Sequence, residues 1–112
     1  GAGVASRWSG PGVARNDCEY PWTHCQPIII TNIDPDSPGY LTAVIVTPTM
    51  FCDCYTGTPD ERLVDLDPAT LAALGFYDRH GDLDLGRGLY PVSVGPVHGE
   101  IPEPALPDTS MR

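Results

Sequence analysis

The sequence predicts a small, mainly β domain with one short helix. Its 112 residues leave room for one domain and for no second core. The 12 Gly and 13 Pro residues indicate many turns and loops, while a hydrophobic content of 41% is enough for one modest core. Two β-branched runs bounded by turn residues predict strands, and one segment carries both a start and a stop signal for a helix.

The strongest strand signals lie in the first half of the chain. Residues 3–8 alternate loosely and are bounded by glycines, which favours a first strand. Residues 28–31 form a β-branched run, and residues 40–47 form a second apolar run. Dense turn residues at 34–39 separate these two runs, so the pair predicts a hairpin.

One helix is expected at about residues 68–74. Asp67 is a favourable N-cap, Pro68 a favourable first helical residue, and Gly75 a favourable stop. We interpret residues 76–87, which follow the helix, as a polar loop.

The last strand is expected at residues 89–94, where Pro91 favours a sheet edge or a bulge. Beyond it the prolines of the C-terminal segment predict an extended, semi-rigid chain. We therefore divide the chain into a domain at 1–97 and a proline-rich tail at 98–112.

Four cysteines predict two disulfides rather than a metal site. They are even in number, and six residues separate the first two while one residue separates the last two, which fits neither knuckle of a zinc ribbon. A Cys52–Cys54 bridge is disfavoured because alternate residues of an extended segment lie near or beyond ~6.8 Å apart at Cα. We therefore expect bridges from the loop of Cys18 and Cys25 to that of Cys52 and Cys54.

Charge and composition exclude several classes of function. The net charge of −9, with six Arg and no Lys, argues against a nucleic-acid partner, because there is no basic surface to release counterions from phosphates. No apolar run approaches the ~20 residues needed to span a bilayer. No glycine-rich phosphate loop or cofactor motif occurs, so no cofactor is expected. Paired cysteines and a first residue other than Met favour a secreted or cell-envelope protein.

An ordered set of segments is similar to one known family. Residues 3–8 match an opening Gly-x-Ala-Ser-Trp-Tyr strand, residues 30–32 a Val-Thr-Asn, and residues 62–67 an Arg-Ile-Ile-Asp-Leu-Ser. Residues 68–75 resemble the Ala-Ala-x-x-Leu-Gly helix that follows. Over roughly residues 3–97 the chain thus resembles double-psi β-barrel domains of the rare lipoprotein A (RlpA) type, relatives of barwin and the expansins. The resemblance implies a six-stranded, closed double-psi barrel with disulfide-stapled loops.

The resemblance also implies a secreted domain that binds bacterial cell-wall glycan (peptidoglycan). Cleavage of the lytic transglycosylase type stays open, because Pro48 stands where the family has its acid and proline cannot transfer a proton. Asp53 is the best substitute acid, and Asp65 matches the family's groove-supporting aspartate. Glu19 and His24 lie in the region where the family carries a glutamate and a histidine, and they complete the catalytic candidates.

Tyr20, Trp22 and Tyr55 are expected to be exposed, where their rings could stack on sugar faces. Two other interpretations stay open at this point. The chain could be a structural subunit of an extracellular filament, surface layer or virus particle, or a barwin- or cerato-platanin-like binding protein. In the first of these the tail would pack on a neighbouring copy through Ile101 and Leu106.

Overall fold

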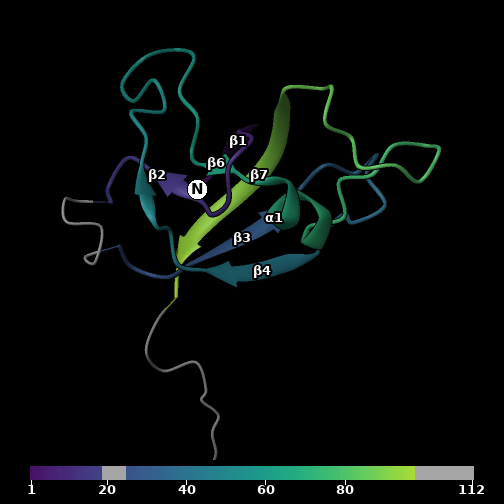
Figure 1. The fold of residues 1–112 in the computed structure, drawn as a ribbon, viewed down its shortest axis with the longest axis horizontal. Coiled ribbons are helices and arrows are strands. Elements are labelled where there is room, and N and C mark those ends of the chain that lie inside the picture. Colours follow the sequence, from purple (N-terminus) through teal and green to yellow (C-terminus); the bar gives the residue numbers. More distant parts are fainter. Residues whose placement is uncertain (19–24, 98–112) are drawn as a thin grey trace, which may run out of the picture.

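The computed structural model describes residues 1–18 and 25–97. Within them, one mixed sheet of seven strands curls into a half-barrel and carries one short helix (Figure 1). The elements are β1 (Ala2–Arg7), β2 (Ala14–Arg15), β3 (Ile28–Asn32), β4 (Ala43–Val46), β5 (Met50–Phe51), β6 (Asp65–Leu66), α1 (Pro68–Ala73) and β7 (Leu89–Pro96). The prediction of a mainly β domain with one helix is confirmed. The sheet has seven strands where six were expected, because β2, β5 and β6 are two residues long and leave no pattern in the sequence.

The strands follow the order β4-β3-β7-β1-β6-β2-β5 across the sheet. β3 and β4 form the expected antiparallel hairpin, with Ile28 opposite Val46 and Thr31 opposite Ala43. β7 is antiparallel to β3 on one side and to β1 on the other. Two pairings are parallel, β1 with β6 and β2 with β5. Within the described residues the sheet therefore ends at β4 on one side and at β5 on the other.

The expectation that Pro91 marks an edge or a bulge is wrong, since β7 lies inside the sheet. Gly1 and Val94 exchange two backbone hydrogen bonds, of 2.7 and 2.9 Å, which makes Val4 and Pro91 a pair without mutual hydrogen bonds. The missing N–H of Pro91 would point away from β1, just past the end of the ladder with β3. Its carbonyl is still used, by the Ile33 N–H at 3.1 Å. The bond that the proline forgoes is the reciprocal one to the Ile33 carbonyl, beyond the last pair of the β3–β7 ladder, Asn32 with Val92.

Alternating burial along the central strands builds the core. Tyr90, Val92 and Val94 of β7 are buried with half-buried residues between them, as are the first and third isoleucines of β3. The core contains Ala5, Val13, Ile28, Ile30, Val64, Leu66, Leu71, Leu74, Phe76, Tyr90, Val92 and Val94.

The helix has the caps that the sequence predicts. The Asp67 carboxylate accepts a hydrogen bond from the Thr70 N–H at 3.0 Å, and Pro68 is the first helical residue. Leu74 is the C-cap of the helix, and Gly75 follows with a φ of 75°, which favours glycine.

The segment after the helix is more than the polar loop that was expected. Phe76 is buried in the core, and its ring meets that of Tyr90 edge to face at 5.2 Å. The Tyr90 hydroxyl donates a 2.6 Å hydrogen bond to the carbonyl of Asp84. The loop is therefore attached to Tyr90 of β7 at two points, through the Phe76 ring and through the Asp84 carbonyl.

Both disulfides are local, so the expectation of bridges between the two loops is wrong. Cys18 pairs with Cys25 and Cys52 with Cys54, with Cα–Cα distances of 4.6 and 5.1 Å. The Cys52–Cys54 bridge is possible because the chain there is not extended. Cys54 has a φ of 53°, and the next residue has a φ of 54°. This left-handed turn shortens the distance between the two cysteines.

The expected tail at residues 98–112, with Ile101 and Leu106, lies outside the described residues. Among the residues that the structure describes, no helix is long and apolar enough to cross a membrane.

Candidate functional site

A recess of about 550 Å³ opens at one end of the half-barrel. Its lining residues belong to the loop that follows β3 and to the segment that follows α1. Figure 1 shows both of these loops at the right, at the other end of the sheet from the loop between β5 and β6. The residues that line it are Asp34, Asp36, Ser37, Tyr77, Asp78, Arg79, His80, Asp84 and Arg87.

The recess is supported from inside by Asn32, which is fully buried at the end of β3. Its amide nitrogen donates to Ser37 Oγ and to the Leu74 carbonyl, both at 2.8 Å. Its amide oxygen accepts from the Asp34 N–H at 2.9 Å. Ser37 Oγ donates in turn to the Gly75 carbonyl at 2.8 Å. One buried side chain therefore ties the end of the helix to the loop that carries Asp34.

An ion pair joins Asp34 and Arg87, two of the residues that line the recess. Arg87 Nη1 lies 2.7 Å from Asp34 Oδ2 and 3.9 Å from Asp84 Oδ2. The guanidinium also lies over the rings of Phe76 and Tyr90, at 5.9 and 5.5 Å from their centroids. Because these contacts come from several sides, the charge of Arg87 has a fixed position.

Two carboxyl groups of the recess are held in the ionised form. Burial raises the pKa of Asp34, but the Asp36 N–H and the Arg87 guanidinium outweigh it, so the pKa lies below its ordinary value. Hydrogen bonds from the N–H groups of Asp82 and His80 lower the pKa of Asp78. Both carboxylates can therefore accept hydrogen bonds at neutral pH, and neither is suited to donate a proton.

The composition of the recess suits a polyhydroxylated ligand. Four aspartates, two arginines and one histidine line it, so it presents both hydrogen-bond acceptors and hydrogen-bond donors. Tyr77 is 36% exposed at its rim, where the ring can cover the C–H face of a sugar. A mostly polar recess with one aromatic wall can bind a sugar ring by hydrogen bonds and stacking together.

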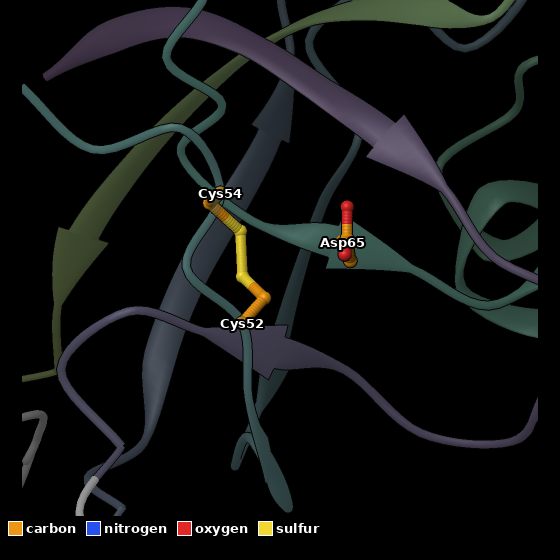
Figure 2. Close-up of side chains that lie close together, drawn as sticks. All are labelled: Cys52, Cys54 and Asp65. Carbon is orange, nitrogen blue, oxygen red and sulfur yellow. A yellow bond between two sulfur atoms is a disulfide. The ribbon is translucent and has the colours of Figure 1, made fainter. Parts of the chain in front are cut away.

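Of the predicted catalytic residues, Asp65 is the one that the structure places in a defined cluster. It lies half-buried on β6, and Ser6 Oγ donates a hydrogen bond to its Oδ1. Its carboxylate lies beside the Cys52–Cys54 bridge, and these ligand atoms are all within 4.8 Å of one another (Figure 2). This cluster is not part of the recess.

Asp53 and Tyr55 are both exposed in the loop after β5. Tyr55 is 58% exposed, as expected, and the guanidinium of Arg62 lies 5.1 Å from its ring centroid. Pro48, the residue at the position expected for an acid from the resemblance alone, is fully buried. The structure therefore does not gather Asp53, Tyr55 and Asp65 around one recess. Glu19, Tyr20, Trp22 and His24 lie outside the described residues.

The sequence did not single out the residues that build the recess. Asn32 was part of the matched segment 30–32, and Asp34 was counted among turn residues. No local sequence pattern indicates a role for Arg87, because its partner Asp34 lies 53 positions away in the chain.

Comparisons of the chain with protein-family models, with curated proteins and with solved structures found no match.

Proposed function

We propose that the chain is a secreted, RlpA-like double-psi β-barrel domain that binds bacterial cell-wall glycan through the recess of Asp34 and Arg87. The observation that carries the proposal is the recess itself, where fixed carboxylates and guanidinium groups stand beside an exposed tyrosine ring. Groups that are already in position lose little freedom when a sugar hydroxyl binds to them.

Three features support the fold and location in this proposal. The curled sheet contains two parallel pairings among antiparallel ones, and a mixed sheet of this kind is what we expect of a double-psi barrel. The segments that resemble the family, at 3–8, 30–32 and 62–67, contribute to β1, β3 and β6. Two disulfides suit an oxidising compartment outside the cell.

Binding without cleavage agrees best with the ionisation of the recess carboxyl groups. Transglycosylation needs a carboxylic acid that is protonated near neutral pH, and such acids have a raised pKa. The pKa of Asp34 and that of Asp78 are lowered instead. Pro48 is buried and offers no proton. We therefore expect retention on peptidoglycan with little or no release of anhydro-sugar products.

Two tyrosines provide a matched test of where glycan binds. Tyr77→Ala removes the aromatic wall of the recess, whereas Tyr55→Ala removes an equally polar, more exposed ring at the other end of the domain. In cosedimentation with purified peptidoglycan sacculi, Tyr77→Ala should weaken binding roughly tenfold, and Tyr55→Ala should leave it unchanged.

The reverse result would move the site to the groove predicted from the sequence, around Asp53 and Asp65. Equal binding by both variants and the parent would reject an aromatic subsite in either place. Failure of the parent chain to bind sacculi at all would reject the proposed function.

A specific observation also favours the second candidate, a structural subunit. Within the described residues no strand pairs with the outer side of β4, and residues 40–47 contain neither a charge nor a proline. Leu41 and Ile45 are 61% and 58% exposed there. Natural edge strands usually carry charges or bulges that prevent pairing, so this edge suits β4 of a second copy.

Light scattering over a concentration series tests this candidate. Ile45→Lys should abolish association, and Leu85→Lys, which adds the same charge at a 37% exposed site elsewhere, should not. Deleting residues 99–112 tests the tail as the alternative contact. A chain that stays monomeric at all concentrations would reject the subunit function.

A further inference from the structure

Cys52, Cys54 and Asp65 form a cluster of metal-ligand side chains away from the recess. Their two sulfur atoms and one carboxylate oxygen lie within 4.8 Å of one another. Figure 2 shows the bridge beside β6, from which Asp65 projects. The cluster thus joins two segments of the chain, a loop and a strand.

The backbone holds each member of the cluster in place. The Cys52 N–H donates to the Arg15 carbonyl at 3.2 Å, and the Arg62 N–H donates to the Cys54 carbonyl at 2.7 Å. Asp65 lies on β6, which is paired with β1 on one side and with β2 on the other. None of these hydrogen bonds involves sulfur, so opening the bridge between the two sulfur atoms removes none of them.

We propose that reduction of the Cys52–Cys54 bridge converts this cluster into a binding site for a divalent metal ion of the zinc class. Two molecules of a thiol reductant supply two electrons and two protons, and they leave joined as a disulfide while the bridge becomes two cysteine thiols. Binding of the ion then releases those two protons, since thiolates are the ligands.

The donor set suits zinc rather than a hard cation. Two thiolates and one carboxylate supply three ligands and three negative charges, and a water molecule can take the fourth tetrahedral position. The Ser6 hydroxyl donates to Oδ1 of Asp65 and so orients the carboxylate, as outer-shell donors do in metal sites. A disulfide offers no thiolate, so occupancy would follow the redox state of the bridge.

The experiment uses the full chain with Cys18→Ser and Cys25→Ser, so that only one cysteine pair can bind metal. After reduction with a phosphine, Co²⁺ should give a thiolate charge-transfer band at one ion per chain, and Zn²⁺ should displace it. The oxidised chain should give no band. Asp65→Asn should weaken Zn²⁺ binding by about tenfold or more, whereas Asp53→Asn, a carboxylate between the same two cysteines, should not change it.

Absence of the band in the reduced chain, or equal affinities of the two aspartate variants, would overturn the proposal. If the variant with Cys18→Ser and Cys25→Ser fails to fold, alkylation of the reduced parent chain tests the same metal site. Zn²⁺ should then protect Cys52 and Cys54 and leave Cys18 and Cys25 reactive. Protection of all four or of none would count against the site. The proposal is independent of glycan binding, which is measured on the oxidised chain.

Discussion

The two ends of the half-barrel hold their loops by different means. At the recess end, which comprises residues 33–42 and 76–88, buried hydrogen bonds and the Asp34–Arg87 pair join segments far apart in the chain. At the disulfide end, which comprises residues 14–18 and 50–65, each covalent bridge spans a sequence separation of only 7 or 2 residues.

This difference indicates which end of the half-barrel holds its side chains in the more precisely fixed positions. A disulfide stabilises mainly by restricting the unfolded chain, and the restriction grows with the logarithm of the loop length. Short bridges therefore shape their own loops but contribute little to the arrangement of the whole domain. A buried network such as that of Asn32 acts on the folded state and fixes distant groups relative to one another. The recess end is accordingly the better place for a binding site.

The largest effect is expected from Gly39→Ala at the recess end. A Cβ at Gly39 would lie 2.1 Å from the Leu74 carbonyl oxygen and 2.5 Å from the Gly75 Cα, and both are backbone atoms. Since neither can move without separating the loop from the helix, the free energy of unfolding should fall by about 4 kcal/mol or more. Urea denaturation followed by circular dichroism measures this loss.

Gly57→Ala is the matched change at the disulfide end. Gly57 has a φ of 81° and nothing lies within 4 Å of a Cβ there. Only backbone strain remains, which costs about 1 kcal/mol. Similar losses for the two alanine variants would contradict the close contact between the loop and the helix.

The second prediction concerns the disulfides. Removing the Cys18–Cys25 bridge with two serines should cost about 2.5 kcal/mol, and removing the Cys52–Cys54 bridge about 1.5 kcal/mol, from loop-closure entropy alone. Reduction of both should therefore lower stability by about 4 kcal/mol. Thermal and urea unfolding with and without reductant measure the combined loss of stability from the two disulfides. A greater loss from the 52–54 pair than from the 18–25 pair would show that the shorter bridge supports more than its own turn.

Local signals explain what could be predicted from the sequence. The helix, predicted at about 68–74 and observed at 68–73, and the hairpin of β3 and β4 could be predicted because capping and turn residues act within a few positions. The disulfide pairing was mistaken because the left-handed turn at Cys54 has no sequence signature such as a glycine. Arg87 could not be assigned, since its role depends on a pairing across 53 positions that only the folded sheet creates.

The third prediction tests the buried network directly. Asn32→Ala removes a fully buried amide that makes three hydrogen bonds. Its partners, Ser37 Oγ, the Leu74 carbonyl and the Asp34 N–H, each lose the hydrogen bond to this amide. Stability should fall by about 3 kcal/mol. Asn16→Ala at the disulfide end also deletes an amide hydrogen bond, of 2.6 Å to Thr56, but at an exposed site. It should cost less than about 0.5 kcal/mol. Equal losses in chemical denaturation would remove the distinction between the two ends.

The last and smallest effect is the pH dependence that Asp34 confers. Its pKa in the folded chain lies below the ordinary value, despite the opposing effect of burial, because the Asp36 N–H and Arg87 stabilise the carboxylate. Below that ordinary value, about 3.9, the unfolded chain binds the proton more readily than the folded one. The stability from Asp34 is therefore fully present above about pH 5 and is lost as the pH falls through the lowered pKa.

Unfolding free energies from about pH 6 down to about pH 2.5 can isolate this contribution. The Arg87 side chain is 32% exposed, so solvent weakens the pair, and Asp34→Asn should cost about 1 kcal/mol at pH 6. That difference from the parent chain should shrink toward zero in acid, because the parent then carries a neutral carboxyl at the same place. Asp53→Asn, the same change at an exposed site of the disulfide end, should leave the free energy of unfolding at pH 6 within about 0.5 kcal/mol of that of the parent. A gap between Asp34→Asn and the parent that is constant with pH would mean that shape, and not charge, holds the two loops of the recess together.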